Sequence, residues 1–137
     1  MMAQLGTLVK KIDNSESMLP YIILWYDIYV EREELYMASI IIYQVKDIEN
    51  CDYAFRSWET AKDKFNMDDY KEVAMFEYKK ELETDELLER IFILGNNGTL
   101  QKDFRMHSIS VSDIIEIDGK KYYTDSFGFQ EVQLWNG

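Results

Sequence analysis

The dipeptide Asp118-Gly119 is the feature that most limits how this chain can fold. It separates two short segments, Ile114–Ile117 and Lys120–Thr124, in which β-branched and aromatic residues predominate. A two-residue type I′ turn requires positive φ angles at both central residues, and Asp-Gly adopts them readily. The sequence therefore predicts a tight antiparallel hairpin over residues 114–124.

Two longer apolar segments precede this hairpin. Residues 21–30 and 35–45 are dense in β-branched and aromatic side chains, and the charged residues 31–34 lie between them. This pattern predicts a second hairpin. Residues 21–30 also fit a buried helix, because a short continuous apolar run does not reveal its own period.

Two further segments are predicted to extend the sheet. Residues 70–78 alternate approximately between apolar and polar, with Val73 and Met75 expected to face the same side. Residues 127–132 are expected to return along the sheet formed by residues 114–124. The sheet should therefore be antiparallel.

Two helices are predicted beside these strands. A short one over residues 57–65 has Ser57 as its candidate N-cap and apolar residues at helical spacing. The second covers residues 85–94 and is expected to begin after a Thr84 N-cap and to stop at Gly95. Acids in its first turn suit the positive end of the helix dipole. Its apolar face consists of Leu87, Leu88, Ile91 and Phe92.

These elements predict an α+β fold in which an antiparallel sheet packs against two short helices. A chain of 137 residues has the usual size of one domain. Its 47% hydrophobic content is enough to offset the entropy cost of folding. We expect residues 1–39 to be an N-terminal extension with a strand of its own and residues 40–137 to be the domain.

The charge of the chain restricts its partners. Fifteen basic and twenty-six acidic residues give a net charge of -11. Phosphates would repel such a protein, so direct binding of nucleic acid is not expected. Acidic charge steers a protein toward basic partners, although acidity can equally serve solubility alone.

The remaining composition favours a cytoplasmic protein. Cys51 is the single cysteine, so no internal disulfide forms and a reducing compartment fits. No apolar run near the N-terminus has the length of a signal peptide. Residues 21–30 are too short to span a bilayer and contain Asp27.

One group of residues resembles a catalytic set but is not expected to act as one. It consists of His107, Ser108, Ser110, Ser112 and Asp113. Nucleophilic catalysis needs a base and an orienting group, and these normally come from separate parts of a fold, whereas here they are consecutive. On an extended segment the serines would share one face while His107 and Asp113 shared the other. We expect instead that the hydroxyls and Asp113 bind turn amides ahead of the hairpin.

No cofactor or metal site is predicted, and the chain is not expected to be an enzyme. One histidine and one cysteine far apart in sequence cannot supply the ligands that zinc prefers. Residues 63–69 lack the acidic spacing and central glycine of a calcium loop. Gly95 and Gly98 are not followed by the Lys-Ser/Thr of a phosphate-binding loop.

The last third of the chain carries two motifs that identify a family. The segment from His107 to Ile115 reads H-S-I-S-V-S-D-I-I, and the segment from Tyr123 to Val132 reads Y-T-D-S-F-G-F-Q-E-V. They resemble the YodL-like domain family of Firmicutes and their mobile elements, from about residue 40 to the C-terminus. The resemblance implies a small α+β domain found in mobile-element and phage-related proteins.

Acidic clusters are the candidate partner-binding residues. Their carboxylates could imitate the rows of phosphates in a nucleic acid. We therefore expect the protein to be an inhibitor of anti-CRISPR or antirestriction type, which occupies the basic nucleic-acid channel of a Cas or restriction nuclease. Their alternative role is a solvated face that complements the helix dipole. The predicted residues are Asp27, Glu31, Glu33, Glu34, Asp68, Asp69, Glu81, Glu83, Asp85 and Glu86.

A second hypothesis requires no acidic surface. The chain would be a non-catalytic adaptor that binds a non-nuclease host protein by a strand edge or an aromatic patch. Such a patch would include Tyr26, Tyr29 and Tyr36. Salt separates the two hypotheses, because binding through carboxylates weakens as ionic strength rises.

Overall fold

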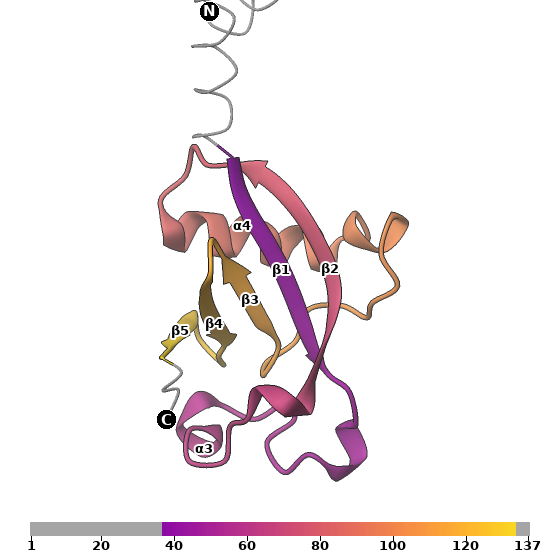
Figure 1. The fold of residues 1–137 in the computed structure, drawn as a ribbon, viewed down its shortest axis with the longest axis vertical. Helices are drawn as coiled ribbons and strands as arrows, with labels where there is room; N and C mark the ends of the chain where they lie inside the picture. Colours follow the sequence, from indigo (N-terminus) through magenta and orange to yellow (C-terminus); the bar gives the residue numbers. More distant parts are fainter. Residues whose placement is uncertain (1–36, 134–137) are drawn as a thin grey trace, which may run out of the picture. The chain divides into compact units, whose positions relative to one another are not determined.

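The structure is a computed structural model that describes residues 37–133. Its strands form one antiparallel five-stranded sheet in the order β2-β1-β3-β4-β5 (Figure 1), which confirms the predicted α+β class. The predicted first strand, residues 21–30, lies outside the described residues. The strands are β1 (Met37–Val45), β2 (Tyr70–Lys79), β3 (Ile114–Ile117), β4 (Lys120–Thr124) and β5 (Phe129–Val132).

The predicted hairpin forms the middle of the sheet. β3 and β4 pair with Ile114 opposite Tyr123 and Ile117 opposite Lys120. Between them Asp118 and Gly119 have φ angles of 49° and 88°, the positive values that the tight turn requires. β1 pairs with the other edge of β3, so it is a central strand between β2 and β3.

One face of the sheet is covered by helix α4, Thr84–Asn96, which lies across β1 and β3 (Figure 1). Side chains alternate between the two faces of a strand and repeat every 3.6 residues around a helix. The apolar side chains of β1 and of α4 that face each other therefore pack together. Leu87, Leu88 and Ile91 of α4 are buried in one cluster with side chains from the sheet. The sheet contributes Ala38, Ile40, Ile42, Ala74, Ile115 and Ile117 to this cluster.

Among residues 37–133, the segment that joins β1 to β2 covers the opposite face near one end of the strands. This segment contains the 3-10 helix η2 (Ile48–Asn50), the short helix α3 (Trp58–Ala61) and the 3-10 helix η3 (Met67–Asp69). It packs a second apolar cluster that is rich in aromatic rings, with the Trp58 and Tyr123 ring centroids 5.0 Å apart. Further rings in the cluster belong to Tyr53, Phe65 and Tyr70.

Both predicted helices exist, but their ends differ from the prediction. α3 ends at Ala61 rather than residue 65. Ser57 is its N-cap residue, yet its hydroxyl makes no capping bond. The amide of Trp58, the first residue of the helix, donates to the Asp125 carboxylate over 3.0 Å. The N-cap of α4 is Glu83 rather than Thr84.

The prediction that the helix stops at Gly95 was wrong, because this glycine has a packing role inside the helix. α4 continues through Gly95 to Asn96. A Cβ atom at Gly95 would collide with the side chain of buried Ile109. The glycine therefore allows a close approach of another segment to the helix.

Burial along β2 agrees with the prediction that Val73 and Met75 face the same side. Val73 is partly buried and Met75 is 55% exposed, whereas Ala74 between them is buried. Ala74 and Phe76 contribute to the α4 side, whereas Tyr70 belongs to the aromatic cluster on the opposite face. Burial thus alternates from Val73 to Tyr78, and the more buried face of β2 is that of Ala74, Phe76 and Tyr78.

Candidate functional site

Four of the predicted acids lie together where β2 leads into α4. Glu81, Glu83, Asp85 and Glu86, the acidic patch, are all exposed. β2 ends at Lys79 and α4 begins at Thr84, so the four carboxylates occupy the connecting loop and the first helical turn. No ion pair within 4.0 Å joins any of them to another residue in the range 37–133. The patch therefore keeps its negative charge over this part of the chain.

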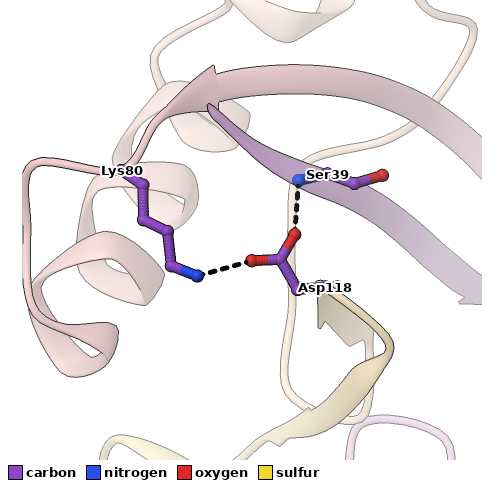
Figure 2. A network of polar contacts seen from close by, with 3 residues as sticks. All are labelled: Ser39, Lys80 and Asp118. Atoms are coloured by element: carbon purple, nitrogen blue, oxygen red, sulfur yellow. Dashed lines mark hydrogen bonds and ion pairs between the residues drawn. The ribbon is translucent and has the colours of Figure 1, made fainter. Parts of the chain in front are cut away.

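The lysine beside the acidic patch is held by a different carboxylate. Lys80 Nζ lies 2.9 Å from Asp118 Oδ2, and the Ser39 amide donates to Asp118 Oδ1 over 2.9 Å (Figure 2). The Ser39 amide first, and then Lys80, lower the pKa of the Asp118 carboxyl below its ordinary value. These contacts attach the start of the β2–α4 loop to the β3–β4 turn. The ammonium group of Lys80 is thus paired with Asp118 rather than with the acidic patch.

Asp68 and Asp69 do not join the acidic patch. They precede β2, whose ten residues separate them from the patch by about 30 Å along an extended strand. Asp69 also has a structural role, because its Oδ2 accepts a hydrogen bond of 2.7 Å from the Tyr53 hydroxyl. Burial, and then this bond, raise the pKa of Tyr53.

The other four predicted acids lie outside the described residues. They are Asp27, Glu31, Glu33 and Glu34. The described part of the chain thus brings four of the ten predicted residues together at one end of β2 and places two at its other end.

The segment around His107 is attached to β1 by a buried amide. Gln44 Oε1 accepts from the His107 backbone amide at 3.3 Å, and Gln44 Nε2 lies 3.0 Å from both the His107 carbonyl and Asp113 Oδ2. Gln44 is 1% exposed. Its side chain therefore fixes the path of the backbone at His107 and satisfies the carboxylate of Asp113.

Asp113 and Ser112 have the predicted structural role. Asp113 Oδ2 accepts from the Ser110 amide at 2.9 Å, and Ser112 Oγ accepts from the Phe55 amide at 2.9 Å. Burial raises the pKa of Asp113 to about 6, against the opposing effects of the Ser110 and Gln44 bonds. The segment is not extended, since Ser112 has a φ of 84°, so the predicted alternation of faces was wrong.

The turn between β4 and β5 carries a side chain that the sequence did not single out. Phe127 is 95% exposed. The turn is closed by a 3.0 Å bond from the Asp125 amide to the Gly128 carbonyl, with Gly128 at a φ of 71°. Phe127 and Gly128 were predicted as part of the returning strand, but β5 begins only at Phe129.

Comparison with known families identifies the family of this domain. The YodL-like domain family matches residues 39–134, which is well over half of the chain. The chain belongs to the YodL-like domain family. This is the family that the His107 and Tyr123 motifs predicted, and the matched range contains Gln44, Asp113, the acidic patch and the Phe127 turn. No curated protein and no solved structure was found to match the chain.

Two features are absent from the described residues of this YodL-like domain. No helix between residues 37 and 133 has the length and apolar character needed to cross a membrane. Over the same residues, no three His, Cys, Asp or Glu side chains are grouped so that they could hold a metal ion.

Proposed function

We propose that this YodL-like domain acts by binding a protein that has a basic groove, and that the partner is a host defence nuclease of Cas or restriction type. The observation that carries the proposal is the acidic patch, in which four exposed carboxylates have no cation partner among residues 37–133. Lys80, the cation next to them in sequence, is bound to Asp118 (Figure 2).

The physical basis is electrostatic. A groove that binds nucleic acid has lysine and arginine side chains placed to meet phosphates. Carboxylates on a fixed helix end can occupy the same cations and exclude the nucleic acid. Long-range attraction between oppositely charged surfaces raises the association rate, and salt screens this attraction. Binding of the partner should therefore weaken as the salt concentration rises.

The test is binding to purified Cas and restriction nucleases at physiological and high salt. In one variant Glu81, Glu83, Asp85 and Glu86 are all replaced by lysine. Its matched control replaces four exposed acids elsewhere, so that the net charge changes equally. The control residues are Asp52, Asp63, Asp103 and Glu131.

We expect the patch variant to lose binding and the control to retain most of it. Equal losses in the two variants would mean that net charge alone is responsible. Binding that survives both high salt and patch reversal would contradict the proposal, as would absence of binding to every nuclease.

A second candidate function is the non-catalytic adaptor. Phe127 favours it, because a phenylalanine that is 95% exposed on a closed turn is available as an anchor for a partner pocket. β2 and β5 are also the edge strands of the described sheet, and edge strands can pair with a partner strand. Binding of this kind should tolerate salt and be lost on truncation of Phe127.

A further inference from the structure

A pocket of about 430 Å³ lies at the end of β1, on the part of the domain away from the acidic patch. Three segments line it: the end of β1 with the following turn, the beginning of β2, and residues 105–107. This volume is within the range of about 300–1,000 Å³ that is typical of small-molecule sites. The pocket can therefore hold a small organic molecule.

Cations from all three segments line this pocket in an otherwise acidic protein. Lys46, Lys71 and Arg105 belong to the lining, and each is exposed. Within residues 37–133 none of the three is joined to an acid by an ion pair of 4.0 Å or less. No ion pair within this part of the chain therefore occupies the three cations, and they are available to attract an anion.

Two acids also line the pocket, and one of them is already engaged. Asp47 Oδ2 accepts a 2.8 Å hydrogen bond from Asn50 Nδ2, within the turn that carries η2. Glu49 is exposed at the pocket. With three lysine and arginine cations against two carboxylates, the lining is net positive in a chain whose total charge is -11.

The backbone on both sides of the pocket is held in place. The Lys46 amide donates to the Asp69 carbonyl over 2.9 Å, which joins the end of β1 to the approach to β2. The two bonds from the Gln44 side chain to the His107 backbone fix the third segment against β1. Such prior ordering reduces the entropy cost of binding.

The histidine ring at the pocket is oriented by its own backbone. His107 Nδ1 lies 2.8 Å from the Ser108 carbonyl oxygen and 3.0 Å from Gln44 Nε2, so both contacts of the ring are made through this one nitrogen. The other ring nitrogen, Nε2, makes no hydrogen bond to a residue between 37 and 133. It is therefore free to contact a ligand.

Apolar side chains complete the lining. Val45, Ile48, Val73 and Met106 belong to it, and Ile48 is 40% exposed. Exposed apolar surface beside cations suits a molecule with an uncharged body and an anionic group. A phosphate monoester has three terminal oxygens and a charge near −2, so it can serve three cations, whereas a carboxylate has two oxygens and one charge.

We infer that this pocket binds a small organic phosphate. Lys46, Lys71 and Arg105 hold its phosphate group, and Ile48 and Met106 contact its organic part. This site is independent of the acidic patch, and neither proposal requires the other.

The experiment is calorimetric titration of the full chain with three matched probes. Phenyl phosphate combines the dianion with an apolar ring, inorganic phosphate has the dianion alone, and benzoate has the ring with a single charge. We expect phenyl phosphate to bind with a stoichiometry of one and at least about tenfold more tightly than either other probe.

Two variants locate the binding. Arg105→Ala removes a pocket cation, and Arg56→Ala removes an exposed arginine that does not line the pocket. Arg105→Ala should weaken phenyl phosphate binding about tenfold or more, and Arg56→Ala should change it less than about twofold. Thermal unfolding of both variants checks that they are folded.

Three results would overturn the inference. The first is an absence of phenyl phosphate binding at millimolar concentration. The second is an equal effect of the two arginine variants, which would indicate attraction by net charge alone. The third is benzoate or inorganic phosphate binding as tightly as phenyl phosphate, because then the dianion or the apolar wall contributes nothing.

Discussion

Gln44 and Asp113 meet in the interior, where Gln44 Nε2 donates to Asp113 Oδ2 over 3.0 Å across a sequence separation of 69 residues. The bond attaches the His107–Asp113 segment to a central strand of the sheet. The Asp113 side chain is almost completely buried, and no lysine or arginine pairs with it among the described residues. The charged form of Asp113 is therefore stabilised only by hydrogen bonds and by the nearby His107, and ionisation of this buried carboxyl still costs free energy.

Asp113 should make the protein less stable as the pH rises through about 6. Burial raises its pKa from 3.8 to about 6, so the folded state binds the proton more tightly than the unfolded state. The resulting stability is fully present below pH 4 and is lost as the pH rises through about 6, by an amount on the order of 3 kcal/mol. Denaturant unfolding at a series of pH values measures this slope.

Asp113→Asn is the variant that isolates this effect. An amide oxygen can still accept the bonds from Ser110 and Gln44, but the group does not ionise. We expect the variant to show a flatter stability curve between pH 4 and 7 than the unchanged chain. A slope that persists in the variant would assign the pH dependence to another group.

Asp118 should have the opposite pH dependence and a smaller effect. Its pKa is lowered, chiefly by the Ser39 amide and then by Lys80, so its contribution is present above the unfolded value near 4 and is lost as the pH falls below it. Asp118→Asn keeps an acceptor for Ser39 and tolerates the φ of 49°. Since exposed ion pairs contribute little, the loss at pH 7 should be below about 1 kcal/mol.

Asp118→Ala is the matched variant for the turn itself. Alanine loses both bonds and is strained at a positive φ, so the free energy of unfolding should fall by about 2 kcal/mol. Equal effects of Asn and Ala would mean that the turn conformation is unimportant and that only the charge matters. Thermal unfolding at pH 7 compares the two.

Gly95→Ala should destabilise the domain although it lies in a helix, where alanine is normally favoured by about 1 kcal/mol. The new methyl group would collide with Ile109, which is 2% exposed and cannot move freely. Overpacking of this kind costs about 1–3 kcal/mol. Chemical denaturation measures the change.

Removing the obstructing side chain should relieve the collision. Ile109→Ala alone leaves a cavity, but it removes the atoms that the methyl group at position 95 would meet. We expect the double variant to be more stable than the sum of the two single losses implies. Strict additivity would show that the helix moves away from Ile109 instead.

Local features made much of the fold predictable from sequence. The Asp118-Gly119 turn requires only two positive φ angles, and these are properties of the dipeptide. α4 was predictable because its apolar residues recur at helical spacing and face one cluster. Its end was not, because what Gly95 does depends on Ile109, which comes from a different segment.

The candidate sites were less predictable because they depend on distances between segments. Asp68 and Glu81 are close in sequence, yet an extended strand places them far apart. The pocket gathers Lys46, Lys71 and Arg105 from three segments, and no spacing in the sequence relates them. Of the H-S-x-S-V-S-D motif, only His107 lines the pocket, so the motif does not indicate this site.

Phe127→Ala tests whether the exposed turn is for folding or for binding. Its side chain is 95% exposed, so truncation should change the free energy of unfolding by less than about 0.5 kcal/mol. Phe129→Ala is the matched control, because that ring packs against the core and lies 6.3 Å from the Phe92 ring, edge to face. Its loss should cost about 2–4 kcal/mol.

Binding then separates the two proposed functions. If the domain is an adaptor, Phe127→Ala abolishes partner binding in a fully folded protein, whereas reversal of the acidic patch leaves it intact. If it is an inhibitor that acts through the acidic patch, reversal of the patch abolishes partner binding. Phe127→Ala then leaves binding intact, because the carboxylates contact the partner without the Phe127 ring. Substantial destabilisation by Phe127→Ala would show that the ring packs within the protein in solution, and the anchor hypothesis would then fail.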